Sequence, residues 1–140
     1  MYRKILVAMD LEHPEQVDKL LSTATSIAQA NGSTIHLLYV IHAGPVILSQ
    51  YLPINYEKMV SGKAQQALGM FATQLDMDRS NISSSVRFGT IYKEVLNHAK
   101  KHNEDLIIIG SHKAHVADNF LGSNASSIVR HAPCSTFVVR

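Results

Sequence analysis

A polar loop between two glycines is the part of this sequence best suited to binding an anion. Gly110 ends an apolar run, and Gly122 begins a helix-like pattern together with Ser123 and Asn124. Backbone N–H groups at the start of a helix are unpaired and carry positive partial charge, so they attract anions. Glycine lets the backbone approach a phosphate closely, and both polar side chains can donate hydrogen bonds. The spacing therefore predicts a phosphate-binding loop.

The same residues also have purely structural interpretations. Gly110 suits an ordinary turn at a strand end, and Ser123 suits an N-cap, a role compatible with phosphate contact. Asp10 follows another apolar run, where it can cap the next helix, close a turn or contact a ligand. The chain contains neither the P-loop motif GxxxxGK[ST] nor the dinucleotide motif GxGxxG. The spacing alone leaves these alternatives open.

Other reactive side chains carry weaker signals. His112 and His115 are three residues apart, but they lie in an expected loop without an evident third ligand, so a metal site is disfavoured. The single cysteine, Cys134, excludes an intrachain disulfide and is predicted to be a small buried side chain rather than a reactive thiol. His36 and His42 are assigned to the surface or to the edge of the core.

The apolar pattern predicts strands that alternate with helices. Short apolar or alternating runs suit strands at residues 5–9, 34–41, 82–88, 105–109 and 135–139. Apolar residues at steps of three and four indicate helices at about 14–31, 60–75, 90–102 and 123–131. Residues 43–55 are expected to form a loop, with room for a short helical turn. The chain is thus predicted to be a single α/β domain over residues 1–140, with a doubly wound, five-stranded parallel sheet in the order 3-2-1-4-5 and helices on both faces.

This topology brings the polar segments together. In open α/β sheets, ligands bind outside the carboxyl ends of the strands, at the point where the strand order reverses. Asp10 follows the first predicted strand and Gly110 ends the fourth, which are neighbours across that point. Both are therefore expected to open into one crevice.

Composition narrows the function classes. Apolar residues make up 46% of the chain, the formal net charge is +2, and the 13 Lys and Arg residues are scattered. Scattered charge disfavours a nucleic-acid surface, and no apolar stretch is long enough to span a membrane. With one cysteine, the chain is predicted to be cytoplasmic.

Four stretches of the sequence resemble the universal stress protein family over the whole length of the chain. They are KILVAMD, LYVIH, FGTIYKEVLNHAKKHNEDLIIIGSHK and LGSNASSIVRHAPCSTFVVR. ATP-binding members of that family have Gly, two residues, Gly, nine residues, and then Gly with Ser or Thr. Here Lys113 stands at the second glycine, and eight residues separate it from Gly122. Lys113 therefore either fills the crevice or contacts phosphate. One branch of the family has the motif GSH followed by a basic residue, with GSN further along the chain, and this resemblance favours contact between Lys113 and phosphate.

The resemblance implies that ATP binds, with or without Mg²⁺. Asp10 would face the ribose, and Val40 would meet adenine through its backbone. The residues implied to surround the nucleotide are Ala8, Met9, Asp10, Val40, Ile109, Gly110, His112, Lys113, Gly122, Ser123 and Asn124.

The favoured function is that of a regulatory or stress-response protein with little or no catalysis. One rival is a slow ATPase or phosphotransferase, for which Asp10 and Asp118 are the nearby acids and His112 is the nearby base. Another is a nucleotide-free dimerisation module with Lys113 closing the pocket. A homodimer, with possible assembly to a tetramer, is expected through the apolar edge strand 135–139, unless a loop covers that edge and the protein stays monomeric.

Overall fold

The computed structural model describes residues 1–42, 46–111 and 121–140. Its strands are β1 (Lys4–Met9), β2 (Thr34–His42), β3 (Ile82–Gly89), β4 (Leu106–Gly110) and β5 (Ser135–Val139). Its α-helices are α1 (Val17–Asn31), α2 (Tyr56–Thr73), α3 (Ile91–His102) and α4 (Ser123–His131). Short 3₁₀ helices are η1 (Pro14–Gln16), η2 (Val46–Tyr51) and η3 (Arg79–Asn81).

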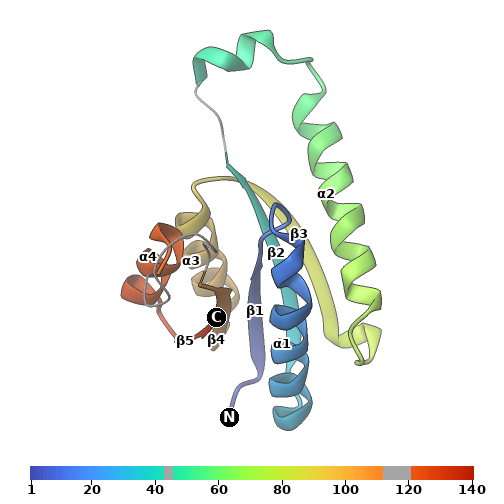
Figure 1. Cartoon of the computed structure of the whole chain (residues 1–140), viewed down its shortest axis with the longest axis vertical. Coiled ribbons are helices and arrows are strands. Elements are labelled where there is room, and N and C mark those ends of the chain that lie inside the picture. The colour runs from blue at the N-terminus through green and yellow to red at the C-terminus, as the bar shows by residue number, and fades with distance from the viewer. Residues whose placement is uncertain (43–45, 112–120) are drawn as a thin grey trace.

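The strands form one parallel sheet in the order β3-β2-β1-β4-β5, which confirms the predicted topology. Helices α1 and α2 lie on one face of the sheet, and α3 and α4 lie on the other (Figure 1). The strand order reverses between β1 and β4. The connection that leaves β1 leads toward β2, and the connection that leaves β4 leads the other way, toward β5. A ligand crevice is expected at this point in a doubly wound sheet.

Alternating strand residues build a separate core on each face. Ile5 and Val7 of β1 pack toward α1 and α2, whereas Leu6 packs toward α3 and α4. All three side chains are fully buried, as expected for a central parallel strand covered on both sides. The central strands therefore form a rigid platform under the crevice.

Most boundaries lie within two residues of the expected ones, but α1 begins three residues later than expected, after η1, and α2 begins four residues earlier. The predicted cap of α4, Ser123, is the first helical residue, and Gly122 is the N-cap. The prediction failed because Gly122 already has the extended conformation that a cap requires, which leaves Ser123 free to enter the helix. Gly32 closes α1 as predicted, with a left-handed φ of 67° that glycine adopts without strain.

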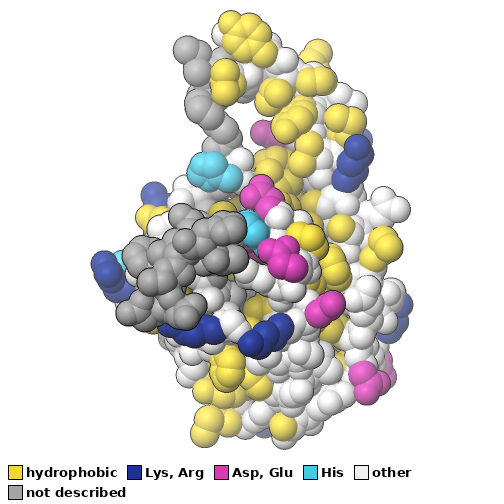
Figure 2. All heavy atoms as spheres, in the orientation of Figure 1, with side chains coloured by type: hydrophobic (Ala, Val, Ile, Leu, Met, Phe, Trp, Pro, Cys, Tyr) yellow, Lys and Arg dark blue, Asp and Glu magenta, His cyan; other side chains and the backbone are white. Residues whose placement is uncertain are grey.

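The segment before α2 carries an exposed apolar surface. Helix η2 and the start of α2 extend beyond the carboxyl end of the sheet (Figure 1), and hydrophobic side chains gather along α2 and its upper end (Figure 2). They include Tyr51, Ile54, Met59 and Met70. No helix in the described part of the chain is long and apolar enough to cross a membrane.

Candidate functional site

A cleft of about 750 Å³ opens at the carboxyl end of the sheet, where the strand order reverses. Its walls come from the ends of β1, β2 and β4, from η1 and the start of α1, and from the first turn of α4. Pockets that bury small organic ligands are typically about 300–1,000 Å³, so this cleft is large enough for a nucleotide.

Asp10 closes the turn that follows β1. Its Oδ1 accepts the backbone N–H of Glu12 at 3.0 Å, and its Oδ2 lies 2.9 Å from Nδ1 of His13. Of the roles left open by the sequence, the structure thus assigns Asp10 to a turn rather than to a helix cap. Because both oxygens are engaged from the η1 side, the carboxylate has a fixed direction at the cleft rim.

Backbone hydrogen bonds tie β4, β5 and α4 together beneath the cleft. Ser111 donates its N–H to the Val139 carbonyl at 2.8 Å, and its own carbonyl accepts the N–H of Gly122 at 3.0 Å. The residue after β4 therefore sets the N-terminus of α4 against the end of the sheet. The bond between Gly122 and Ser111 joins residues that are eleven positions apart in the sequence.

The first turn of α4 faces the cleft. Gly122, Ser123 and Asn124 all line it, and Gly122 has no side chain that could accept the first N–H groups of the helix. Those N–H groups have no acceptor one turn earlier in the helix and carry positive partial charge. Anions are attracted to such a position. The phosphate-binding loop stays a prediction, and of its residues Gly110, Gly122, Ser123 and Asn124 line the cleft.

Gly110 approaches η1 closely on the opposite wall. A Cβ atom at Gly110 would lie 3.4 Å from Oε1 of Gln16, an ordinary van der Waals distance to the end of a flexible side chain. The end of β4 and the end of η1 therefore lie side by side in the wall of the cleft.

The η1 side of the cleft is acidic. Glu12 and Asp10 lie close enough to Tyr39 to raise the pKa of its hydroxyl, although burial is the larger cause of that increase. The hydroxyl, which is protonated at neutral pH in any ordinary tyrosine, can donate a hydrogen bond. Lys19, which also lines the cleft, donates to the Arg140 carbonyl.

The structure brings together every predicted nucleotide-binding residue that it describes. Those along the cleft are Ala8, Met9, Asp10, Val40, Ile109, Gly110, Gly122, Ser123 and Asn124. The predicted residues His112 and Lys113 lie outside the described residues, as do His115 and Asp118.

Sequence reasoning missed the η1 wall, which contributes Glu12, His13 and Gln16. A usable signal was present: Pro14 marks a helix start, and a helix that begins just after a strand end must pass the cleft. Tyr39 was also missed, although it sits directly before Val40 in β2.

Metal and thiol chemistry find little support. Among residues 1–42, 46–111 and 121–140, no group of three or more His, Cys, Asp or Glu side chains is arranged to hold a metal ion. Cys134 is half-buried, and burial raises the pKa of its thiol, with smaller contributions from Asp105 and Glu104. A raised pKa lowers the thiolate fraction. Cys134 packs against the core on the α3 and α4 face, but it is only partly buried rather than buried as predicted.

The fold and the cleft define a doubly wound α/β protein with a cleft at its switch point. The family model described as the universal stress protein family matches residues 1–140, so the chain belongs to that family. The chain is 32% identical over 143 residues to universal stress protein G of Shigella flexneri, with full coverage of both chains.

Solved structures show the same architecture. Universal stress protein UspA from Lactobacillus plantarum is 25% identical, with a TM-score of 0.73 and coverage of 99% of this chain and 98% of that one. A universal stress protein from Archaeoglobus fulgidus in complex with dAMP is 15% identical, with a TM-score of 0.68 and coverage of 99% and 98%. A further neighbour with the same identity and TM-score, solved in complex with cAMP, matches 99% of this chain and 97% of its own. At 15% identity, the likeness to the last two concerns the fold.

Proposed function

We propose that this protein is a cytoplasmic regulatory protein of the stress response that binds ATP or a related adenine nucleotide in the cleft at the end of β1 and β4. The observation that carries the proposal is the first turn of α4, which presents uncapped N–H groups to a cleft of nucleotide size. Family neighbours solved with dAMP and cAMP support an adenine ligand.

The cleft offers distinct surroundings for the parts of a nucleotide. The α4 end, with Gly122 and Ser123, suits phosphate. Asp10 at the rim suits a ribose hydroxyl, because a carboxylate accepts hydrogen bonds. The β2 end, at Val40 and Ile41, is largely apolar and suits a base. This order runs from phosphate at α4 to base at β2.

Regulation, rather than fast catalysis, suits the described residues better. Phosphoryl transfer needs Mg²⁺ ligands and a group that positions the nucleophile. The acidic groups of the cleft stand on the η1 side, where Asp10 is already engaged in its turn. Any Mg²⁺ would accompany ATP mainly through the phosphates, as is usual for this ion. Occupancy of the cleft would then act by ordering the surrounding segments.

Calorimetric titration of the purified protein with ATP tests the proposal. Wild type should show saturable binding, and Gly122→Val should weaken it at least about tenfold, equivalent to about 1.4 kcal/mol, because the added side chain occupies space needed by phosphate. Gly69→Val is a matched control, since an added Cβ at Gly69 on α2 meets nothing within 4 Å. Equal affinity in wild type and Gly122→Val would refute the assignment.

A further inference from the structure

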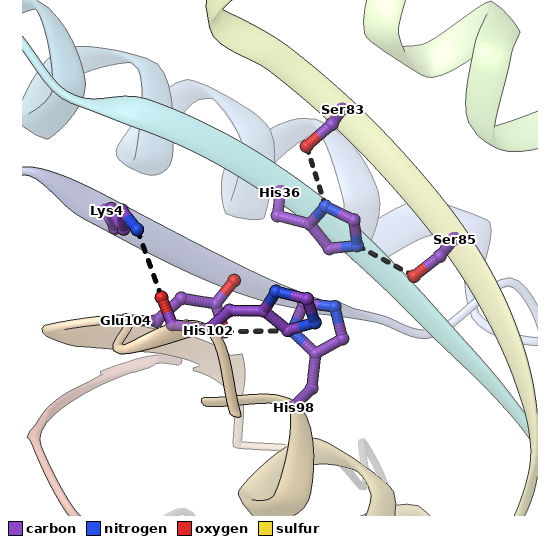
Figure 3. A network of polar contacts seen from close by, with 7 residues as sticks. All are labelled: Lys4, His36, Ser83, Ser85, His98, His102 and Glu104. Carbon is purple, nitrogen blue, oxygen red and sulfur yellow. Dashed lines mark hydrogen bonds and ion pairs between the residues drawn. The ribbon is translucent and has the colours of Figure 1, made fainter. Parts of the chain in front are cut away.

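Three imidazole rings stack in a row at the other end of the sheet from the cleft. His36 of β2 stacks on His98 of α3, with ring centroids 4.4 Å apart and planes at 26°. His98 stacks in turn on His102, at 4.2 Å and 30°. Figure 3 shows how these rings bridge the sheet and the helix, and we refer to them as the histidine column.

His36 is partly buried, in agreement with its predicted place at the edge of the core. Its Nδ1 lies 2.7 Å from the Ser83 hydroxyl, and its Nε2 lies 2.7 Å from that of Ser85. Hydroxyl groups both donate and accept, so these contacts suit either protonation state of the ring. Burial and neighbouring charge must therefore decide which state is favoured.

His98 has a buried carboxylate beside it. Its Nδ1 lies 2.9 Å from Oε2 of Glu104, and the two residues are only 8% and 7% exposed. Glu104 follows α3 in the turn toward β4. A positive charge on His98 would be matched by this carboxylate, so the column can accommodate one proton charge at that position.

Within the described part of the chain, a second charge in the column would have no matching anion. The charged groups that face it are Lys4 from β1, Arg87 from β3 and Glu104 from the turn after α3. Lys4 also donates its ammonium to the His102 carbonyl at 3.2 Å. Two cations and a single carboxylate therefore surround three rings that can each take up a proton, which makes further protonation unfavourable.

The stacking disfavours a shared metal ion. Imidazole binds metals through lone pairs in the plane of the ring, and planes only 26° and 30° apart direct those lone pairs side by side rather than toward one point. This agrees with the lack of a metal-holding group in the part of the chain that the structure describes. The column is better suited to responding to protons.

We propose that the histidine column is a proton-sensitive latch that holds α3 against β2 and β3 near neutral pH and releases α3 on acidification. Neutral rings stack and pack in this position. Protonation of His36 places a cation against His98, His102 and Arg87, and separation of α3 from the sheet relieves that repulsion.

The direction of the pH effect follows from His36. Burial is the main cause that lowers its pKa, followed by His98, His102 and Arg87, and the resulting value is about 4 against 6.5 for an ordinary histidine. The unfolded or released state therefore binds more protons between these values. Stability from the neutral column is complete above about pH 6.5 and is lost as the pH falls toward about 4.

Hydrogen exchange of the full chain, without nucleotide, tests this proposal. Between pH 7 and pH 5, amide protection in α3, corrected for intrinsic rates, should fall on the order of tenfold more than protection in α1, because one pKa unit corresponds to a tenfold change. His36→Gln should remove this difference, since glutamine does not titrate. His131→Gln, which replaces an exposed histidine of α4, should leave it unchanged.

A second measurement covers the case in which His36→Gln fails to fold. Ring-nitrogen NMR of the wild type should show His36 half-protonated below pH 5. A midpoint at pH 6 or above, or equal loss of protection in α1 and α3, would overturn the latch. A gain of α3 protection on addition of zinc that is reversed by EDTA would replace it with a metal site. Failure of ATP binding would leave this proposal intact, because the test uses no nucleotide.

Discussion

The carboxylate of Asp10 and the imidazole of His13 meet at 2.9 Å on the rim of the cleft, within a turn closed by the N–H of Glu12. The carboxylate is therefore oriented before any ligand arrives, and such preorganisation lowers the cost of binding. Loss of the carboxylate charge can be separated from loss of the turn. Asparagine at position 10 retains an oxygen that can accept the Glu12 N–H, whereas alanine does not.

Replacement of Asp10 should weaken adenosine and ATP by similar factors, since a ribose contact is common to both. We expect Asp10→Ala to cost on the order of 1–2 kcal/mol in calorimetric titrations, and Asp10→Asn to cost less because its turn survives. A loss confined to ATP would place Asp10 against the phosphates instead.

Lys113 should affect ATP and adenosine differently. It lies outside the described residues, so its role rests on the sequence alone. If its ammonium contacts phosphate, Lys113→Ala should weaken ATP by on the order of 1–3 kcal/mol and leave adenosine nearly unchanged. If Lys113 fills the crevice, the same variant should bind both ligands more tightly. The sign of the change decides between the two.

ATP turnover should be slow. Common enzymes turn over at roughly 1–1,000 per second, and we expect steady-state phosphate release far below that range because the described part of the cleft lacks a clustered set of metal-binding acids. A phosphate-release assay with wild type and Asp10→Asn measures this directly. Rapid release in wild type that Asp10→Asn abolishes would favour the ATPase alternative.

The β5 edge should pair with a second copy of the chain. β5 is the last strand of the sheet, and Phe137 on it is 44% exposed. The Val139 carbonyl accepts from Ser111 on the β4 side. Since outward and inward groups alternate along a strand, the N–H of Val138 points to the open edge. Val138→Pro therefore removes a donor that a partner strand would use, without breaking the pairing with β4.

Light scattering coupled to size exclusion tests this assembly. Wild type should elute with at least twice the 15.4 kDa chain mass, and Phe137→Lys or Val138→Pro should shift it toward monomer. Phe137→Leu keeps an apolar side chain at the edge and should remain assembled. A wild-type monomer at micromolar concentration, with and without ATP, would exclude the edge pairing.

Asp105 should matter for stability because it fastens the two central strands. Its carboxylate accepts the N–H groups of Arg3 and Lys4 at 3.0–3.1 Å, next to the start of β1. We expect Asp105→Ala to lower the free energy of unfolding in urea by about 1–2 kcal/mol, and Asp105→Asn to lower it less, since one acceptor oxygen remains. An alanine variant as stable as wild type would show that water replaces these contacts without cost.

Most of the fold could be predicted because its central strands are unusually uniform. The run Leu106 to Ile109 is buried on both faces, and such runs occur almost only in parallel sheets flanked by helices. The end of α1 was also readable, since Gly32 supplies a conformation that other residues adopt only with strain. Helix η2 was harder to predict, because a turn of six residues has too few positions to show a period.

The site was predictable where it depends on strand ends and less so where it depends on packing. Gly110 ends β4 and Gly122 precedes α4, and the sequence shows both as glycines that flank a polar stretch. The contact between Asp10 and His13 depends on the direction in which the chain enters η1. The conformational preferences of the individual residues did not predict that direction. The histidine column was missed because it joins β2 to α3 across more than sixty positions; only the spacing of four between His98 and His102, typical of one helix face, hinted at it.

Helix α3 extends from the cleft to the histidine column. Ile91 at its first turn lines the cleft, and His102 at its last turn belongs to the column, roughly 16 Å away at the usual helical rise of 1.5 Å per residue. If α3 moves as one rigid body, a shift at either end displaces the other end. Thermodynamic reciprocity then applies. If protonation of the histidine column lowers the affinity for a ligand that touches Ile91, binding of that ligand must lower the proton affinity of the column by the same factor.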